Sequence, residues 1–398
     1  MQNCFGMFVH FGLYASLGYH EQALARRALD RAEYEHLTES FAPERGTPEE
    51  WVLLAKRAGM KYLCFTAKHH DGFCLWDTET TDYSVMHTPC GRDLVGELAD
   101  ACRRHGVALS IYYSNPDWHH PNAYTPLSSH QWRSVSPESA DREAYLAYVK
   151  AQITELLSNY GEIYSLFWDI PPGFEDPSIN ELVRRLQPGI LINDRGYDAG
   201  DFSTPERVIP AGTRFSRMTE ACQSVGSLSW GYRENEDYYS VRYLTSSIDH
   251  VMAMGGSSLL NVGPMANGHI PETAAEIVSR VGAWYAKTEG VLEGNDADPF
   301  PYQVSVDDPF DAFQKNGKTY LHFYDGVRSS AIAIKNYPNV PRRVRLMNTG
   351  KELPCAAERL PEFFNGKTGV AETVYLHIWN IPADALCDEP IVVEIAWK

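Results

Sequence analysis

Side chains able to do chemistry follow five short apolar runs that predict β-strands. If these strands are parallel, their carboxyl ends meet at one edge, and the side chains there converge on a common site. The strands and side chains are 5–10, ending in His10; 61–67, followed by His69, His70 and Asp71; 107–113, ending in Tyr112 and Tyr113 and followed by Asp117 and Trp118; 163–168, ending in Trp168 and followed by Asp169; and 190–193, ending in Asn193 and followed by Asp194 and Arg195.

Two kinds of site fit this cluster of histidines and carboxylates. Imidazole and carboxylate ligate Zn, Mn or Fe, so a catalytic metal is one interpretation. However, adjacent side chains on an extended strand point to opposite faces, so His69 and His70 are not expected to bind one ion. Recognition of a sugar explains the set better, because imidazoles hydrogen-bond hydroxyl groups and indoles offer a flat face to the C–H side of a pyranose. We therefore expect no metal.

Hydrolysis of a glycoside requires two carboxyl groups across the scissile bond. Asp169 is the natural first member, since it ends an apolar strand where Arg195 from the next strand can keep it ionised. A purely structural role for Asp169, capping the loop before Pro171, is the alternative. The second carboxyl should come from a later strand end, which leaves Glu206 and Glu220.

Helices alternate with the strands over the first 290 residues or so. Seven or eight parallel β/α units that close on themselves predict a (β/α) TIM-like barrel, an α/β fold whose chemistry sits at the carboxyl ends of the strands. Thr47 is a plausible N-cap for the first long helix. The predicted helices are 48–58, 92–105, 138–159, 178–187, 238–254 and 271–288, and further strands lie near 206–210, 217–222 and 258–262.

The sequence from 300 to 398 changes to short β-rich runs separated by turn residues, which predicts a C-terminal antiparallel β-sandwich. We place the boundary in 295–300, giving a catalytic barrel of residues 1–295 and a sandwich domain of residues 296–398. Tyr375 and Trp379 alternate as residues of a strand in a core do, so they favour a structural role for this domain over sugar binding.

Composition excludes several classes of protein. With 44% hydrophobic and 22% charged residues the chain is globular, and the net charge of −17 without a basic block argues against nucleic acid and favours an uncharged substrate. No apolar run is long enough to span a membrane, and no signal peptide is recognisable. The eight cysteines lack disulfide or zinc spacing, so we expect a cytoplasmic protein.

Several longer motifs resemble the α-L-fucosidases of glycoside hydrolase family 29. These are FGMFVHFGLYA (5–15), KHHDGFCLWDTETTDYSV (68–85), GRDLVGELADACRRHG (91–106), YYSNPDW (112–118), NYGEIYSLFWD (159–169), NDRG (193–196), SWGY (229–232) and GGSSLLNVGPMANGHIPE (255–272). The resemblance implies a barrel with a C-terminal β-sandwich, a retaining double displacement on terminal α-L-fucose of an oligosaccharide or glycan, and no cofactor.

The resemblance also assigns roles to single residues. Asp169 stands where the family has its nucleophile. The matching sugar-binding residues are His10, His69, His70, Tyr112 or Tyr113, Arg195 and Glu21, the last standing where many members carry a Glu-Trp pair. Here Gln22 replaces the Trp of that pair.

The position of the acid/base residue differs between branches of this family. Glu220 matches the acid/base of one branch and Glu206 that of another, and we favour Glu220. Many members place Trp two residues before the nucleophile, whereas this chain has Phe167 there and Trp168 next to Asp169. An aromatic ring among Trp76, Trp168 and Trp230 is expected to pack against the C5 methyl group of the sugar.

Other functions stay open at this stage. An α-L-galactosidase or β-D-arabinopyranosidase would share the ring stereochemistry and differ only at C5. A non-catalytic fucose-binding protein would use the same pocket without turnover, and a transglycosidase would differ only in the access of water to the intermediate.

Overall fold

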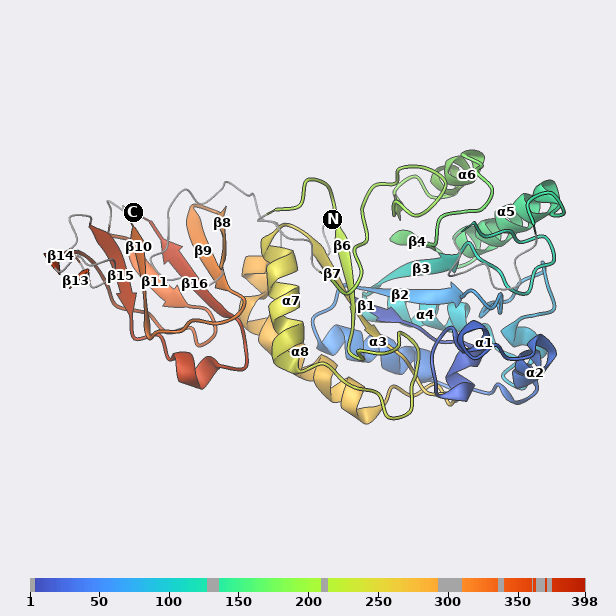
Figure 1. Ribbon diagram of the computed structural model, residues 1–398, viewed down its shortest axis with the longest axis horizontal. Helices are drawn as coiled ribbons and strands as arrows, with labels where there is room; N and C mark the ends of the chain where they lie inside the picture. Colours follow the sequence, from blue (N-terminus) through green and yellow to red (C-terminus); the bar gives the residue numbers. More distant parts are fainter. Residues whose placement is uncertain are drawn as a thin grey trace.

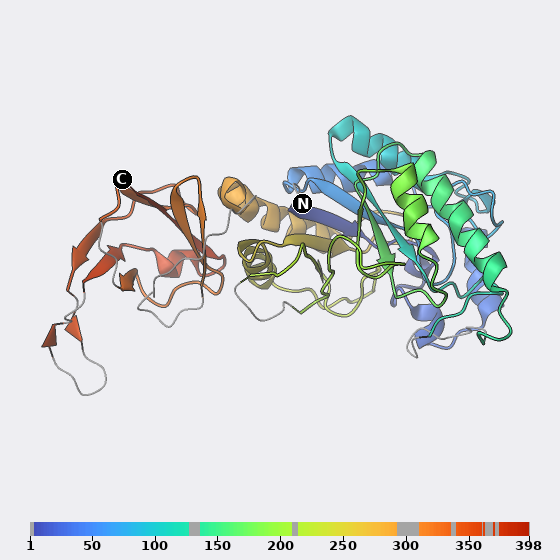
Figure 2. The ribbon, with the colours of Figure 1, turned by 90° about the horizontal axis from the view of Figure 1, so that it is seen from above.

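The computed structural model describes residues 4–126, 136–208, 214–292, 310–335, 340–359, 361–362, 369–370 and 374–397. The described residues up to 292 form a β/α barrel, and the later described strands form a separate antiparallel unit (Figure 1). Helices α7 (Val241–Ala253) and α8 (Glu272–Leu292) lie between the barrel strands and the C-terminal strands in both ribbon views (Figure 2).

Seven parallel strands make up the barrel sheet, in the order β5-β4-β3-β2-β1-β7-β6. Parallel bridges from Asn193 to Phe202, from Ser203 to Thr219 and from Glu206 to Cys222 place the segment 202–206 between β5 and β6. This segment takes the place of an eighth strand, which confirms the predicted barrel. The strands are β1 Phe5–Val9, β2 Tyr62–Lys68, β3 Ala108–Ser114, β4 Ser165–Asp169, β5 Leu191–Ile192, β6 Glu220–Ser224 and β7 Ser257–Val262.

The outer helices agree with the sequence prediction to within a few residues. Asp93, Asp141 and Ser240 cap helices through side-chain acceptors. The prediction of Thr47 as an N-cap was wrong: Gly46 takes that position with a φ of 87°, and the Thr47 hydroxyl donates to the Glu44 carbonyl. The other helices are α1 Ala23–Arg26, α2 Arg31–Glu35, α3 Thr47–Arg57, α4 Leu94–His105, α5 Arg142–Ser158 and α6 Ser178–Leu186.

Side chains along each strand alternate between the two faces of the sheet, so the core of the barrel has two layers. The larger cluster fills the space between sheet and helices, and a smaller one fills the barrel interior. Because side chains two residues apart share a face, the interior residues Phe8 and Phe167 direct His10 and Asp169 toward the barrel mouth. The interior cluster comprises Phe8, Tyr62, Cys64, Tyr112, Phe167, Cys222 and Leu259.

Two antiparallel sheets form the C-terminal unit, as predicted, with orders β10-β15-β12 and β11-β16-β9-β8. Leu376 and Ile378 of β15 face the core, whereas Tyr375 and Trp379 are only half-buried, so their interpretation as core residues was wrong. The expected boundary at 295–300 lies outside the described residues. The strands are β8 Asp311–Lys315, β9 Lys318–Phe323, β10 Ala331–Lys335, β11 Arg343–Leu346, β12 Cys355–Glu358, β15 Tyr375–Trp379 and β16 Ile391–Ala396, and a separate pair is formed by β13 Pro361–Glu362 and β14 Gly369–Val370.

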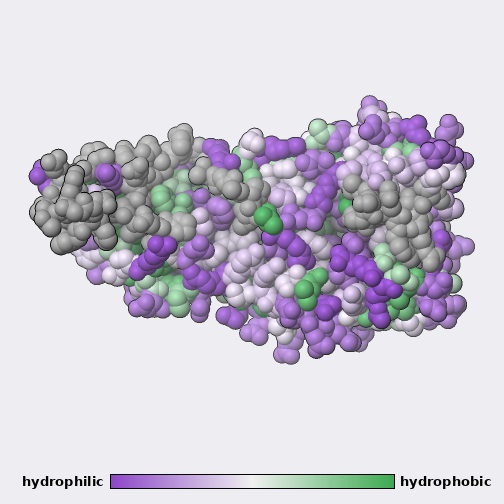
Figure 3. Space-filling model, in the orientation of Figure 1, coloured by the Kyte–Doolittle hydropathy of each residue, from purple (hydrophilic) through white to green (hydrophobic). Residues whose placement is uncertain are grey.

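Helix α7 packs against β8 and β9, where Asp249 and His322 form a fully buried pair at 2.8 Å. Over the barrel half of the face in Figure 3, hydrophobic residues are scattered among hydrophilic ones. Within the described residues, no helix is both long and apolar enough to cross a membrane.

Candidate active site

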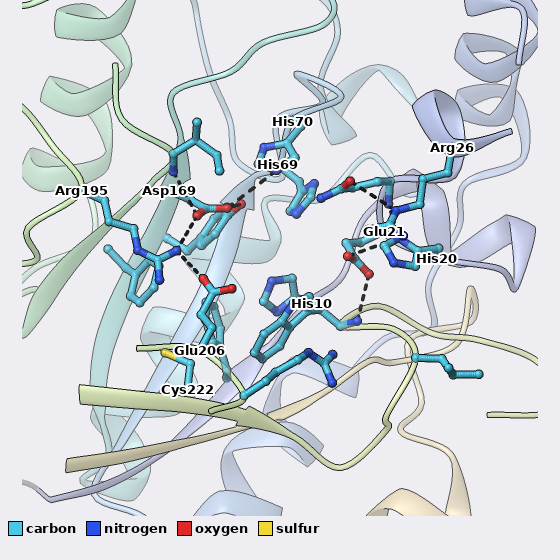
Figure 4. Close-up of a pocket in the computed structure, with 18 of the residues that line it drawn as sticks. His10, His20, Glu21, Arg26, His69, His70, Asp169, Arg195, Glu206 and Cys222 are labelled. Carbon is cyan, nitrogen blue, oxygen red and sulfur yellow. Dashed lines mark hydrogen bonds and ion pairs between the residues drawn. The ribbon is translucent and has the colours of Figure 1, made fainter. Parts of the chain in front are cut away.

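A cavity of about 290 Å³ opens at the carboxyl ends of the barrel strands. Asp169 and Arg195 lie on one wall and His20, Glu21 and Arg26 on the opposite wall (Figure 4). The lining residues are Phe8, His10, His20, Glu21, Gln22, Arg26, His69, His70, Tyr112, Phe167, Asp169, Ile170, Arg195, Glu206, Arg207, Cys222, Ser227, Leu228 and Trp230.

Asp169, the last residue of β4, is a carboxylate of the cavity with several polar contacts. Its Oδ2 accepts a 2.6 Å hydrogen bond from the Tyr112 hydroxyl, and its Oδ1 accepts one of 3.0 Å from Arg195 Nη1. His70 Nε2 lies 3.7 Å from Oδ2. Burial alone would raise the pKa of Asp169, but the charges of His70 and Arg195 and the Tyr112 hydrogen bond outweigh it and hold the pKa below its usual value. Asp169 is therefore an ionised carboxylate.

The backbone after Asp169 is strained. Ile170 has a φ of 61°, a left-handed conformation that β-branched residues rarely adopt. In this conformation the Ile170 amide donates to Asp169 Oδ1 at 3.0 Å, and the Ile170 carbonyl accepts from Asn115 Nδ2 at 2.6 Å. Strain of about 1–3 kcal/mol is retained here, and it fixes the orientation of the carboxylate.

Glu206 and Asp169 contact the same guanidinium nitrogen of Arg195. Arg195 Nη1 contacts both Asp169 and Glu206, and Arg195 Nη2 donates to the Thr204 carbonyl. The Glu206 side chain is 41% exposed, so it stands at the opening of the cavity. Burial raises the pKa of Glu206, Arg195 lowers it and Asp169 raises it, and the balance is a raised pKa. A carboxyl group whose pKa is raised next to an ionised carboxylate is suited to act as an acid.

Glu220, which we favoured as the acid/base from the sequence, does not line the cavity. It begins β6, two residues below Cys222, and its carboxylate accepts a hydrogen bond from Tyr62 inside the barrel. Burial raises its pKa to about 7. The preference for Glu220 over Glu206 therefore disagrees with the placement of the two side chains: Glu220 is enclosed by the barrel interior and Glu206 reaches the cavity.

The three predicted histidines all line the cavity. His10 Nδ1 is 2.7 Å from Asn261 Oδ1, and burial lowers the pKa of His10 to about 4, so its ring is neutral. His69 and His70 were expected on opposite faces, but β2 ends at Lys68 and strand alternation stops there. Their ring centroids are 4.2 Å apart, and both face the cavity.

These rings also bear on the metal alternative. Ligand atoms of His69, His70 and Asp169 lie within 4.8 Å of one another, so these three residues could hold a cation. Hydrogen bonds engage His70 Nδ1 with Ser114 Oγ at 2.7 Å, and Asp169 with Tyr112 and Arg195. The geometric reason given above against a shared ion was therefore wrong, while the hydrogen bonds favour a site organised around Asp169.

Of the three tryptophans proposed to contact the sugar, one lines the cavity. Trp230 stacks on His10 with ring centroids 5.5 Å apart. Trp76 and Trp168 are buried on the outer side of the sheet, where they donate to Glu155 and Asn180 respectively. Their proposed contact with the sugar was wrong: Trp168 faces the opposite side of β4 from its neighbour Phe167, and Trp76 lies outside the strands and is buried in the outer core.

The same alternation shows, for two pairs of neighbouring residues, which one lines the cavity. Phe167, not Trp168, lines the cavity and stacks on Tyr112. Tyr112 points inward to Asp169, whereas the Tyr113 hydroxyl bonds Gln152 on α5, so the cavity tyrosine is Tyr112.

Glu21 lines the cavity and also holds the loop 229–231. Its Oε2 accepts from Ser229 Oγ, from the Trp230 amide and from the Gly231 amide at 2.9–3.2 Å. A Cβ at position 231 would approach the Tyr14 ring to 2.8 Å, so Gly231 permits this close packing. Glu21 thereby positions the Trp230 ring at the cavity.

Some lining residues were not predicted. Phe8 and Phe167 could have been found, since each lies two residues before a predicted site residue on the same strand. His20, Arg26, Arg207 and Leu228 come from loops or a short helix, and no periodicity points to them. Conversely, Asp71 and Asp117 follow predicted strands but are buried beside the cavity, bonded to Tyr34 and Lys68 respectively.

Comparisons of the sequence and of the fold with known proteins point to one family. The family model for α-L-fucosidase matches residues 1–289. The human tissue α-L-fucosidase is 26% identical over 312 residues, which is 70% of this chain and 65% of that protein. The match thus spans just under two thirds of that protein, and equally 66% of the plasma α-L-fucosidase of Pongo abelii.

Two solved structures cover nearly all of the chain. α-L-fucosidase isoenzyme 1 from Paenibacillus thiaminolyticus has 32% identity and a TM-score of 0.83, over 100% of this chain and 97% of that one. The Thermotoga maritima α-fucosidase, solved in complex with a mechanism-based inhibitor, has 26% identity and a TM-score of 0.79, over 99% and 95% respectively.

A barrel of this kind, with an ionised aspartate at the end of β4 and a second carboxyl facing it, defines a glycoside hydrolase architecture. The family match covers nearly three quarters of the sequence, and the structural match extends over all of it. The chain belongs to the α-L-fucosidase family.

Proposed function

We propose that this protein is a retaining exo-α-L-fucosidase that removes terminal α-L-fucose from fucosylated oligosaccharides or glycans. The observation that carries the proposal is the pairing of Asp169 and Glu206 on one guanidinium nitrogen of Arg195. A retaining enzyme needs two carboxyl groups about 5–5.5 Å apart, one ionised and one protonated. The opposite directions of their pKa shifts support this assignment.

In the first step a carboxylate oxygen of Asp169 attacks C1 of the fucose. The bond from C1 to the leaving oxygen breaks, and Glu206 transfers its proton to that oxygen. The product is a fucosyl ester on Asp169 with inverted configuration. Once Asp169 is esterified its negative charge is gone, so the pKa of Glu206 falls and Glu206 becomes a base.

In the second step Glu206 takes a proton from water. The water oxygen attacks C1 from the side the leaving group occupied, and the ester bond to Asp169 breaks. Two inversions give a product of retained configuration. The 41% exposure of the Glu206 side chain admits water and a leaving group from the opening of the cavity.

The remaining lining residues suit a 6-deoxy sugar. His10, His69 and His70 present imidazole nitrogens to the ring hydroxyls, and Phe8, Phe167 and Trp230 supply apolar surface. Tyr112 and Arg195 hold Asp169 and leave the nucleophile a single orientation. No step requires a cofactor.

The C-terminal strands contribute no residue to the lining of the cavity, so we propose that this domain supports the barrel through α7 and α8 rather than contacting the fucose. Six of the eight cysteines are buried thiols, as suits a reducing cytoplasm.

The test is the hydrolysis of an aryl α-L-fucoside, with the first-formed anomer of the product followed by proton NMR. We expect α-L-fucose to appear first, and we expect Asp169→Ala to be inactive with an unchanged unfolding temperature. Formation of β-L-fucose first would contradict the double displacement. Turnover confined to α-L-galactosides or β-D-arabinopyranosides would favour those activities instead, and fucose binding without turnover of any of them would make the protein a binding module.

A further inference from the structure

Asn261 is a fully buried amide behind the cavity that the proposed mechanism does not use. It lies on β7, within the sequence motif 255–272. Its Oδ1 is 2.7 Å from His10 Nδ1, and its Nδ2 is 2.7 Å from the Trp230 carbonyl oxygen and 3.0 Å from Ser224 Oγ. Asn261 thus contacts both the His10 ring and the residue whose ring stacks on it.

These contacts fix which way the amide of Asn261 is turned. A carbonyl oxygen can only accept, so the group that faces the Trp230 carbonyl is the amide NH2 and not the amide oxygen. Its second N–H donates to Ser224 Oγ, whose own hydroxyl proton is donated to the Ser229 carbonyl at 3.3 Å. The atom that faces His10 is therefore the amide oxygen, Oδ1.

The orientation of the amide in turn fixes the position of the proton on His10. Because Asn261 Oδ1 can only accept, His10 Nδ1 carries the proton of their hydrogen bond. Burial lowers the pKa of His10 to about 4, so this is the one proton on the ring at neutral pH, and Nε2 carries a lone pair. His10 lines the cavity between Asp169 and Glu21 (Figure 4), and within the described residues Nε2 has no hydrogen-bond partner.

The neighbouring ring of His70 is held by the same kind of bond but differs in its second nitrogen. Ser114 Oγ donates to the Pro116 carbonyl at 2.6 Å, so it accepts from His70 Nδ1. A second proton on His70 can sit only on Nε2, 3.7 Å from Asp169 Oδ2. Burial raises the pKa of Asp169, and the charge of His70 is first among the effects that lower it. His70 therefore directs a proton toward the nucleophile, whereas His10 offers a lone pair.

We propose that Asn261 is a positioning residue that holds His10 in the Nδ1–H tautomer, and that His10 consequently selects a sugar hydroxyl group that donates a hydrogen bond to it; this inference rests on the proposed function. An acceptor-only nitrogen binds a hydroxyl through the hydroxyl proton. The same nitrogen gains nothing from fluorine at that position, because fluorine has lone pairs and no proton. His10 thus distinguishes groups of similar size by whether they can donate.

The direct test is nitrogen-15 NMR of the wild-type enzyme, labelled at histidine, at neutral pH. The signals of His10 are assigned by their loss in His10→Gln. We expect a protonated Nδ1 and an unprotonated Nε2. A proton on Nε2 instead would overturn the inference, and this measurement depends neither on activity nor on the folding of a variant of Asn261.

Kinetics test whether the tautomer selects the substrate. The substrates are an aryl α-L-fucoside and its deoxyfluoro derivatives at C2, C3 and C4, and the measured quantity is the ratio of fluorinated to parent kcat/KM. Asn261→Leu removes the acceptor, so His10 can carry its proton on Nε2 and donate it to fluorine. At one of the three positions we expect the ratio to rise about tenfold over wild type, the size of one hydrogen bond. The electronic effect of fluorine on the reaction cancels, because both enzymes receive the same substrates.

Ser224→Ala is the matched control. Ser224 is also buried and also contacts Asn261, but through Nδ2, so its removal leaves Oδ1 facing His10. The His10 signals should be unchanged and each ratio should stay within about twofold of wild type. Thermal unfolding of both variants checks that they are folded.

Ratios in a folded Asn261→Leu variant that equal those of the wild type at all three positions would overturn the selection by His10 and leave the proposed function standing. An equal rise in Ser224→Ala would also overturn it, since the effect would then come from packing around Asn261. Failure of the wild type to hydrolyse the parent fucoside would count against the proposed function, while the NMR spectrum would still decide the tautomer.

Discussion

Removal of one hydroxyl group should change the pH range in which the enzyme works. The Tyr112 hydroxyl donates a 2.6 Å hydrogen bond to Asp169 Oδ2 from inside the barrel, where Tyr112 is almost fully buried. This bond stabilises the ionised form of Asp169, which the attack on C1 requires. Tyr112→Phe removes it without changing the ring that packs against Phe8 and Phe167.

The expected size of the pKa shift follows from the negative charge of the hydrogen-bond acceptor, Asp169. A hydrogen bond to a charged group contributes about 1.5–3 kcal/mol, and about 1.4 kcal/mol corresponds to one pKa unit. The pKa of Asp169 is below its usual value in the native enzyme, so losing the bond moves it upward by about one to two units. Because activity needs ionised Asp169, the acidic limb of the kcat/KM profile should move to higher pH by the same amount.

The assay is the pH dependence of kcat/KM on an aryl α-L-fucoside, with Tyr62→Phe as the matched control. Tyr62 is also buried in the barrel interior and also donates to a carboxylate, but that carboxylate is Glu220. Its removal should leave both limbs in place, with thermal unfolding to confirm the fold. An unmoved acidic limb in Tyr112→Phe would refute the role assigned to this hydrogen bond. A moved basic limb in Tyr62→Phe would return the acid/base role to Glu220.

Three further outcomes follow from the structure. Asp169→Ala should lower kcat by at least about three orders of magnitude, as loss of a nucleophile does, when measured on the same fucoside. Phe167→Ala should lower kcat/KM by up to about tenfold, because a ring that packs in the cavity contributes about 0.5–1.5 kcal/mol beyond its area; an unchanged value would remove Phe167 from the sugar site. The pKa of Glu220 is about 7 in the folded protein instead of 4.5. Its contribution to the free energy of unfolding, about 3 kcal/mol, is therefore fully present below about pH 4.5 and is lost as the pH rises through 7. Glu220→Gln should therefore flatten the decline of the unfolding temperature between pH 5 and 8, and an equally steep decline would contradict the burial argument.

The strands and the residues at their ends were predictable from local patterns. Apolar runs followed by His10 and Asp169 identify both the strands and the edge where they converge, because parallel strands share one carboxyl end. Period-two alternation, applied backward from Asp169, also identifies Phe167 as a cavity residue and excludes Trp168.

Other features depended on contacts between distant segments. His69 and His70 face the same cavity because β2 ends before them, and no pattern in that segment marks its last residue. The positions of Glu206 and Glu220 depend on the bridge that pairs Glu206 with Cys222, which places Glu206 beside the cavity end of β6 and leaves Glu220 enclosed at its start. Arg26 and Arg207 reach the cavity from a four-residue helix and a loop, which carry no periodic signal.

The most direct test of the carboxylate pair is rescue by azide of Glu206→Ala compared with Glu220→Ala, on an aryl fucoside whose leaving group needs no acid. Glu206→Ala should form the fucosyl ester but lack the base that activates water. Azide needs no base, so it should accelerate turnover and yield α-L-fucosyl azide. Glu220→Ala should release fucose with no effect of azide. Azide rescue of Glu220→Ala, with Glu206→Ala unaffected, would contradict the account.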